Sequence, residues 1–336
     1  MREPTVAAGV VRGLVDFAVS KGAGAGALFE QSGIGPADLQ GHDNRIAFAK
    51  YVALMRAAKA LCNDPALALH YGEAVALSEI SIIGLIGEAS ETVIEAMAQI
   101  NRYARLAIEV DTGVDDRFTM ERRDGLLWLI DNRKNPNDFP ELTESVFARS
   151  ASGMRRLGEG AMLKGIHVSH PDPGYRAEYE RILRAPVFFG SDRNAMLLDE
   201  VWLSHRIRTQ PRYVFGILAE RADALLAALE SSKSTRGCVE KLLMPVMHTG
   251  ETGMDAIAAK MGLSRQTLFR RLKAEGTTYE KVLDELRRRL ALDYLGGKKT
   301  SVNETAYLVG FSDPAAFSRA FKRWTGRSPR NMRVSQ

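Results

Sequence analysis

The chain has 336 residues, of which 45% are hydrophobic and 26% charged, and a formal net charge of +5, values that are ordinary for a globular protein of two or three domains. Its two cysteines, Cys62 and Cys238, lie far apart, so neither a disulfide framework nor a structural zinc site is expected. The apolar N-terminal run carries Arg12 and Asp16, which argues against a signal peptide or a membrane span.

The first two thirds of the chain combine helical and strand patterns. Apolar residues recur with a period of 3.6 in four segments, which predicts helices over 6–21, 48–61, 65–75 and 91–103. Two alternating runs flank Asp124-Gly125 and predict a β-hairpin over 117–132. A helix, a strand and a second helix are expected next, over 142–157, 164–169 and 175–183. These elements predict a mixed α+β domain over residues 1–210.

No catalytic constellation is found in this part of the sequence. His167 and His170 have a spacing that could suit a metal, but no Cys or further His stands close to them in the sequence. Ordinary surface or turn histidines are therefore the preferred interpretation, and no metal site and no cofactor are predicted. Seven aromatic residues could line a small-molecule pocket, although each is individually more typical of a core: Tyr51, Tyr71, Tyr103, Phe118, Trp128, Phe188 and Phe189.

A further helix is expected to begin at Pro211 and to run to about residue 230. Five positions of this helix are spaced alternately by four and three residues, and they form a short heptad-like seam that two chains could share. These positions are Val214, Leu218, Arg221, Leu225 and Ala228. Packing of this helix against its own domain is an equal alternative. The segment 231–237, SSKSTRG, is small and polar, and it is interpreted as a linker at a domain boundary.

Positive charge is concentrated after this linker. Residues 235–336 contain 19 Lys plus Arg against 10 Asp plus Glu, an excess of +9, so the first 234 residues carry −4 of the total of +5. This asymmetry favours a polyanionic partner for the C-terminal part and a different role for the rest.

The C-terminal part contains an internal repeat of about 48 residues. GLSRQTLFRRLKAEG, from Gly262, corresponds to GFSDPAAFSRAFKRWTG, from Gly310, when one extra residue is allowed. Each glycine lies where a tight corner between two helices needs a positive φ. Ser264 and Asp313 are expected to cap the second helix of each copy. Each copy is therefore predicted to be a helix-turn-helix unit with a basic second helix.

The front of each basic helix is expected to reach base edges in DNA. In the first copy the candidates are Gln266, Thr267 and Arg270. In the second copy the front carries Ala315, Ala316 and Arg319, and two alanines can offer only apolar contact. The second copy should therefore read sequence less strongly than the first.

A helix over 279–295 is predicted between the two copies. Its length of roughly 25 Å is shorter than the 34 Å or so between successive major grooves, which suggests that bound DNA bends toward the protein. The run Arg287, Arg288, Arg289 could contact phosphate. The favoured alternative is a solvated face in which Asp284 pairs with Arg288 and Glu285 with Arg289.

The segment from about 238 to 333 resembles the C-terminal DNA-binding domain of the AraC/XylS family of bacterial transcription regulators. The resemblance lies in MDAIAAKMGLSRQTLFRRLKAEGTTY, DELRRRLALDYL and, most specifically, ETAYLVGFSDPAAFSRAFKRWTGRSPRNMR. It implies base contacts from the fronts of both helices, namely Arg265, Gln266, Thr267, Phe269, Arg270, Ala315, Ala316 and Arg319. Basic residues farther along the same helices complete the expected DNA-binding set: Lys273, Lys322 and Arg323.

The N-terminal part is similar to a subgroup of this family that includes ornithine-utilisation and virulence regulators. The resemblance rests on IIGLIGEASETVIEAMAQINRY and on the order helices, hairpin, helix, strand, over roughly residues 5–205. It implies an effector-sensing domain that differs from the β-rich cupin sensor of sugar-responsive members. The effector and the residues that bind it are left open.

The sequence thus predicts a cytoplasmic, homodimeric transcription regulator, for instance an activator. An α+β effector-sensing domain over 1–210 is followed by a dimerisation helix and linker over 211–237 and by an all-α DNA-binding domain with two helix-turn-helix units over 238–336. The expected partners are tandem half-sites in double-stranded DNA, RNA polymerase and a small-molecule effector. One alternative is a DNA-targeted enzyme with a reactive cysteine, although Cys62 has no basic neighbour in the sequence. The other is a ligand-independent DNA-binding protein.

Overall fold

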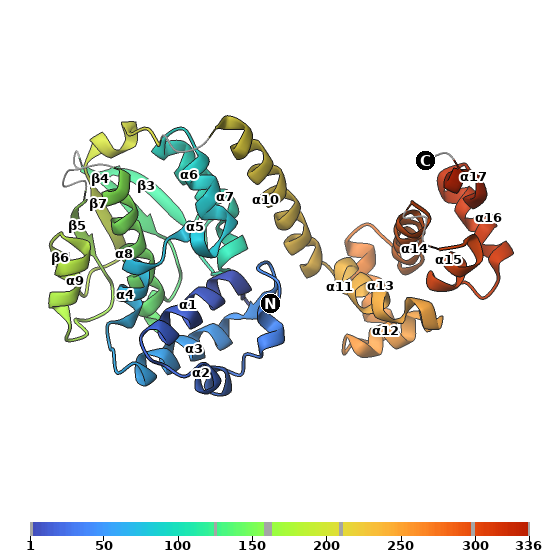
Figure 1. Cartoon of the computed structure of the whole chain (residues 1–336), viewed down its shortest axis with the longest axis horizontal. Coiled ribbons are helices and arrows are strands. Elements are labelled where there is room, and N and C mark those ends of the chain that lie inside the picture. Colours follow the sequence, from blue (N-terminus) through green and yellow to red (C-terminus); the bar gives the residue numbers. More distant parts are fainter. Residues whose placement is uncertain (1–2, 124–125, 158–162, 208–210, 297–299, 335–336) are drawn as a thin grey trace. The chain divides into compact units, whose positions relative to one another are not determined.

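The computed structural model describes residues 3–123, 126–157, 163–207, 211–296 and 300–334. The chain divides into two compact units, here called unit 1 (residues 1–226) and unit 2 (residues 227–336). Figure 1 shows the elements of both units along the chain.

A five-stranded sheet forms the centre of unit 1. Its strand order is β3-β4-β7-β5-β6, and every neighbouring pair is antiparallel except β5 and β6, which are parallel. The strands span Phe118–Arg123 (β3), Leu126–Asp131 (β4), Leu163–His167 (β5), Val187–Phe188 (β6) and Asn194–Leu198 (β7). The predicted hairpin is confirmed as β3 and β4, while its turn residues 124–125 lie outside the described residues.

Strand β7 lies in the middle of the sheet but was not expected from the sequence. Its residues, NAMLL, are mostly buried and therefore lack the alternation of polar and apolar residues that marks a half-exposed strand. Because β7 pairs with β4 on one side and β5 on the other, burial on both faces explains this continuous apolar run.

One face of the sheet packs against helices. In register, Leu129, Met196, Ile166 and Val187 form a row across four strands and belong to a single buried core. The helices that complete this core are α4 (Leu67–Ala74), α7 (Val93–Ala107), α8 (Pro140–Leu157) and α9 (Arg176–Leu183). Helices α4 and α8 approach closely at Gly72, where an added Cβ would lie 2.3 Å from the carbonyl oxygen of Ser145.

The N-terminal segment of unit 1 adds a two-stranded sheet and further helices. Strand β1 (Thr5–Ala7) pairs with β2 (Arg45–Ala47), so the helix expected from residue 6 instead begins at Ala8 as α1 (Ala8–Ser20). Helix α3 (Phe48–Leu61) has the predicted bounds. The remaining helical segments of unit 1 before α10 are α2 (Ala25–Ser32), η1 (Pro36–Leu39), α5 (Leu77–Ile80), α6 (Ile82–Ala89), η2 (Pro136–Asp138) and η3 (Glu200–Ser204).

Helix α10 (Arg212–Lys233) begins in unit 1 and ends in unit 2. Its first half is bonded to unit 1: Arg221 pairs with Asp43 at 2.9 Å, and Asp223 accepts a hydrogen bond of 2.7 Å from the Tyr103 hydroxyl. Packing of this half against its own unit, one of the two alternatives, is therefore observed. The expected linker 231–237 is mostly helical, because α10 continues to Lys233 and Ser234 caps the next helix, α11 (Thr235–Leu243).

Unit 2 is all-α, as predicted. It continues after α11 with η4 (Met244–Thr249), α12 (Met254–Lys260), α13 (Arg265–Ala274), α14 (Tyr279–Gly296), α15 (Val302–Leu308), α16 (Pro314–Thr325) and α17 (Pro329–Val334). Helix α14 contributes to two cores. Tyr279, Val282 and Leu286 belong to the core of α11–α13, and Ala291 and Leu295 belong to that of α15 and α16. Over the described residues of both units, no helix combines the length and the apolar character that a membrane span requires.

Candidate nucleic-acid interface and ligand cavity

The two helix-turn-helix units of unit 2 have the same turn. Gly262 and Gly310 have φ values of +66° and +77°, as their positions in the repeat predicted. After each glycine, the next backbone N–H donates back across the turn: Leu263 N to Ala258 O at 2.9 Å, and Phe311 N to Ala306 O at 2.9 Å. The duplication in sequence is therefore a duplication in backbone geometry.

The second helix of each copy begins at the predicted cap. The Ser264 hydroxyl accepts from the N–H of Thr267 at 3.2 Å at the start of α13. The Asp313 carboxylate accepts from the N–H groups of Ala315 and Ala316, both at 2.9 Å, at the start of α16. These two backbone bonds hold the pKa of Asp313 below its usual range, and both helix starts are fixed by local chemistry.

Helix α13 buries Leu268 and Leu272 and exposes a polar and basic side. On that side Gln266, Arg270 and Lys273 are exposed, and Phe269 is 50% exposed. Two other candidates are already bonded within the protein. The Thr267 hydroxyl lies 2.9 Å from that of Ser264, and Arg265 pairs with Asp255 at 2.8 Å, although both members of this ion pair are exposed.

Helix α16 buries Phe317 and Phe321 and exposes Ala315, Arg319 and Lys322, while Ala316 is half-buried. Arg319 lies 3.9 Å from the capping carboxylate of Asp313. Arg323, by contrast, pairs with Asp284 of α14 at 2.8 Å, and the indole N–H of Trp324 donates to the same carboxylate oxygen at 3.3 Å. Of the basic residues expected on this helix, Arg323 is the one held against the connecting helix.

The three arginines of α14 have different surroundings. The predicted i,i+4 pairs are wrong, because tertiary neighbours take the acidic partners: Asp284 pairs with Arg323, and Glu285 with Arg236 at 2.6 Å. Arg289 pairs with Glu240 at 2.9 Å, Arg288 is exposed, and Arg287 is half-buried against the turn of the second copy.

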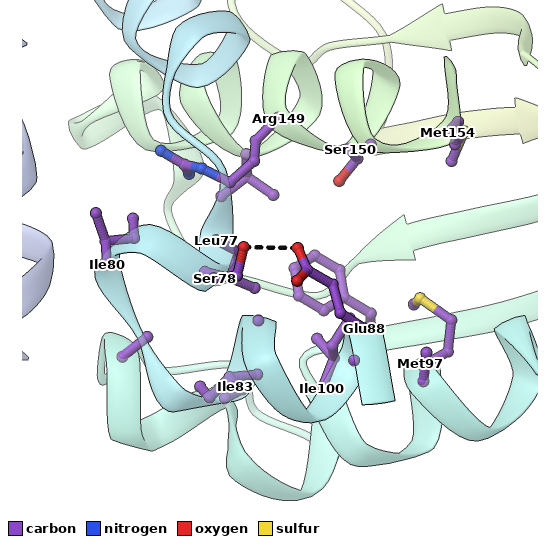
Figure 2. Close-up of a pocket in the computed structure, with 18 of the residues that line it drawn as sticks. Leu77, Ser78, Ile80, Ile83, Glu88, Met97, Ile100, Arg149, Ser150 and Met154 are labelled. Atoms are coloured by element: carbon purple, nitrogen blue, oxygen red, sulfur yellow. Dashed lines mark hydrogen bonds between the residues drawn. The ribbon is translucent and has the colours of Figure 1, made fainter. Parts of the chain in front are cut away.

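Unit 1 contains a cavity of about 420 Å³, within the range of small-molecule sites. Its wall comes mainly from α5, α6, α7 and α8, with contributions from the sheet and from Trp202 of η3. Figure 2 shows Leu77, Ile83, Ile100 and Met154 around the same space, together with the hydrogen bond between Ser78 and Glu88. In this bond, 2.6 Å long, the Ser78 hydroxyl donates to the Glu88 carboxylate.

Two of the seven aromatic candidates, Tyr51 and Phe118, line this cavity. Tyr71 and Tyr103 are buried and donate their hydroxyls within the protein, and Phe189 packs on Tyr179. Trp128 and Phe188 flank His167, with ring centroids 5.0 and 4.8 Å from it. The sequence analysis did not single out two polar side chains of the cavity, Arg149 and Trp202. Arg149 lies within the predicted helix 142–157, and no pattern in the sequence marks Trp202.

The histidines have structural partners. The His167 ring bonds the Ser191 hydroxyl at 3.2 Å, and His170 lies 2.9 Å from the Tyr179 hydroxyl. Within the ranges that the structure describes, no group of three or more His, Cys, Asp or Glu is arranged to hold a metal ion.

The paired turns and basic helices define a helix-turn-helix DNA-binding protein. Residues 22–207, more than half of the chain, match the family described as the arabinose-binding domain of AraC transcription regulators, N-terminal, and residues 257–335 match a helix-turn-helix domain. The chain therefore belongs to the AraC family of transcription regulators, and the expected resemblance is confirmed. Its N-terminal unit, a mixed sheet covered by helices, agrees with the predicted α+β class.

Curated relatives match this chain along most of its length. The ornithine utilization regulator of Pseudomonas aeruginosa is 27% identical over 333 residues, which cover 95% of this chain and 94% of the relative. The HTH-type transcriptional regulator VirS of Mycobacterium tuberculosis is 23% identical over 294 residues, covering 87% and 85%. Among solved structures, the transcriptional regulator CdpR from Pseudomonas aeruginosa has a TM-score of 0.38 at 24% identity, covering 80% of this chain and 87% of that one.

Proposed function

We propose that this regulator binds tandem half-sites in promoter DNA through α13 and α16 and that a small molecule in the unit 1 cavity controls the binding. The observation that carries the proposal is the pair of identical turns, each followed by a capped helix with exposed basic residues. Exposed side chains at the front of such helices are placed to contact base edges in the major groove.

The proposed contacts differ in kind along each helix. Gln266 and Arg270 of α13 and Arg319 of α16 would read base edges, since their polar groups suit adenine and guanine. Arg265, Thr267 and Phe269, together with Ala315 and Ala316, would complete the fronts of the two helices. Lys273 and Lys322 would contact phosphate, and Arg323 would do so only if its pair with Asp284 opens.

A salt titration of promoter binding tests the DNA-binding role. Affinity should fall steeply with salt because phosphate contacts release counterions. Arg270→Ala should cost about 1 to 3 kcal/mol at one base pair and relax specificity there. Lys273→Ala is the matched control on the same helix, because it should weaken all sequences equally. Indifference of binding to salt would contradict the proposal.

The division of labour along the chain is part of the proposal. Residues 1–210 would sense the effector, 211–237 would form the dimerisation helix and linker, and 238–336 would bind DNA. Arg221 of the expected seam pairs with Asp43 of its own chain, so a second copy that used this seam would have to displace or accommodate that exposed pair. Sedimentation velocity on the full chain, with and without operator DNA, tests the homodimer.

We further propose that the protein acts in the cytoplasm and contacts RNA polymerase, and that it is not an enzyme. The alternative function, a DNA-targeted enzyme with a reactive cysteine, requires a thiol whose pKa is lowered. Burial instead raises the pKa of the Cys62 thiol, whose sulfur lies 3.5 Å from the carbonyl oxygen of Ala18. In vitro transcription from a bound promoter tests the polymerase contact, and retention of DNA binding after thiol alkylation tests the role of cysteine.

The remaining alternative, a DNA-binding protein without ligand control, differs from the proposal in what the unit 1 cavity does. A true effector should raise the melting temperature by mass action and change promoter affinity in parallel. A metabolite panel screened by thermal shift, followed by gel shift with each hit, separates the two. Hits that stabilise the chain but leave DNA affinity unchanged would favour the alternative.

A further inference from the structure

The wall of the unit 1 cavity is mostly apolar. Apolar side chains from several helices and from the sheet line the enclosed space, among them Ile80, Ile83, Met97, Ile100, Leu129 and Met154. The body of a ligand held there would gain from leaving water, as in most small-molecule sites.

Several polar groups of this wall are already bonded to the protein. The Ser78 hydroxyl donates to Glu88 at 2.6 Å, and the Ser145 hydroxyl donates to the carbonyl oxygen of Leu142 at 3.2 Å. Arg117 donates to the buried carboxylate of Asp131, with both bonds at 3.4 Å. A sugar carries a hydroxyl on nearly every carbon and each buried hydroxyl needs a partner, so this wall suits a sugar poorly.

Two buried donors of the cavity residues lack a partner. Nη2 of Arg149 and Nε1 of Trp202 are both buried, and neither has a hydrogen-bond partner among the described residues. Each is an N–H group, so each calls for an acceptor. An unpaired buried donor is unfavourable, and a ligand that brings a negatively charged oxygen would satisfy it.

Arg149 is held in place for such a role. Its Nε donates to the carbonyl oxygen of Val75 at 2.8 Å, and its guanidinium lies 5.0 Å from the centre of the Tyr71 ring. Figure 2 shows the guanidinium extending from α8 toward the side of the cavity formed by Leu77 and Ile80. The protein thus fixes one edge of the guanidinium and the Tyr71 side of it, while Nη2 has no hydrogen-bond partner among the described residues.

We infer that the cavity binds an amphipathic monoanion, with one carboxylate or similar oxyanion against Arg149 and an apolar body along α6 and α7. This inference rests on the proposed effector-sensing function and specifies its ligand class. The ligand class therefore differs from a sugar.

A matched pair of fluorescent probes tests the anionic group. 8-Anilino-1-naphthalenesulfonate and N-phenyl-1-naphthylamine share one ring system, and only the first carries a sulfonate. Fluorescence titration of the full chain should give at least about tenfold tighter binding of the sulfonate, as a charge-assisted hydrogen bond to Arg149 predicts. Arabinose should not displace it.

Two substitutions in α8 test whether Arg149 is the residue that makes the sulfonate probe bind more tightly than the neutral probe. Arg149→Gln should remove the preference for the sulfonate while the neutral probe binds as before. Arg156→Gln makes the same charge change at an exposed cavity residue, also on α8, and should keep the preference. Equal affinity of the wild type for both probes, or an unchanged preference in Arg149→Gln, would overturn the inference.

A filled cavity provides the second test. Gly153 of α8 lines the cavity, and a Cβ added there meets no atom within 4 Å, so Gly153→Leu should occupy the space without a clash. The variant should keep its melting temperature and lose sulfonate binding at least about tenfold. Gly26→Leu, at an equally open helical glycine that does not line the cavity, is the control.

The outcomes separate this inference from the proposed function. Unchanged sulfonate binding in Gly153→Leu would show that the probe binds elsewhere and would overturn the inference. Gel shifts with promoter DNA on the same proteins measure the proposed function independently. Failure of the wild type to bind promoter DNA would contradict the proposed function. Failure of the wild type to prefer the sulfonate probe, with promoter binding intact, would contradict only the inferred ligand class.

Discussion

Arg287 of α14 donates through Nη2 to the carbonyl oxygen of Gly310, at 3.0 Å, in the turn of the second helix-turn-helix unit. Its Nε donates to the carbonyl oxygen of Val309 at 3.1 Å, and its guanidinium lies 4.7 Å from the centre of the Phe311 ring. The same Nη2 lies 3.4 Å from the hydroxyl of Thr252, which precedes α12 in the first unit. One side chain thus links both helix-turn-helix units, and its burial lowers the pKa of the guanidinium.

Replacing Arg287 should weaken the link between the two DNA-reading helices. We expect Arg287→Ala to lower the free energy of unfolding by about 1 to 3 kcal/mol, because two carbonyl groups lose their donor. It should also weaken binding to tandem half-sites more than to one half-site. Arg288→Ala, at the adjacent exposed arginine, should stay within about 0.5 kcal/mol of the wild type. Urea unfolding and gel shifts measure both effects, and equal results for the two variants would contradict this role.

The two turn glycines should differ in their tolerance of alanine. Both need a positive φ, which costs an L-residue roughly 1 to 2 kcal/mol. At Gly310 an added Cβ would also lie 2.6 Å from the carbonyl oxygen of Met247, whereas at Gly262 it meets no atom within 4 Å. Gly310→Ala should therefore destabilise the chain more than Gly262→Ala in thermal or urea unfolding. The reverse order would show that the contact with η4 is not maintained in solution.

The cap of α16 should make stability depend on pH. Hydrogen bonds from the N–H groups of Ala315 and Ala316 lower the pKa of Asp313 from its ordinary value of 3.8. A carboxyl group with a lowered folded-state pKa stabilises fully above its unfolded pKa and loses this contribution as the pH falls through the folded value. Asp313→Asn removes the titration, so the wild type should lose its advantage over the variant only below about pH 4. A difference that stays constant down to pH 2 would argue against the bonds.

Neighbouring basic residues of α16 should have separate roles. Lys322 is exposed, while Arg323 is paired with Asp284. Lys322→Gln should therefore reduce the salt dependence of DNA binding by about one released ion. Arg323→Gln should instead change the free energy of unfolding slightly, by about 0.2 to 1 kcal/mol as is usual for an exposed pair, with little change in the salt slope. Salt titrations of promoter binding compare the two variants, and a larger change of slope in Arg323→Gln would reverse the assignment.

The elements recovered from the sequence depend on short-range chemistry. The turn glycines, the caps Ser264 and Asp313 and the buried stripes of α13 and α16 are each determined within about one helical turn, so local spacing was enough to find them. The bounds of α3 were likewise predicted, because an amphipathic stripe sets them. Strand β7 was missed because burial on both faces removed its alternation.

Only the tertiary structure decided the partners that are distant in the chain. From the sequence, Asp284 was expected to pair with Arg288. In the folded protein it pairs with Arg323 instead, because an ion pair forms with the charge that lies close in space. Arg149 and Trp202 belong to one cavity although they lie on different elements, and no periodicity marks a donor that is left without a partner. The sequence by itself determined a duplicated DNA-reading unit, because turns and caps are local. The fold decided what its charges bind and where a ligand can enter, because those contacts require the packing of the whole unit.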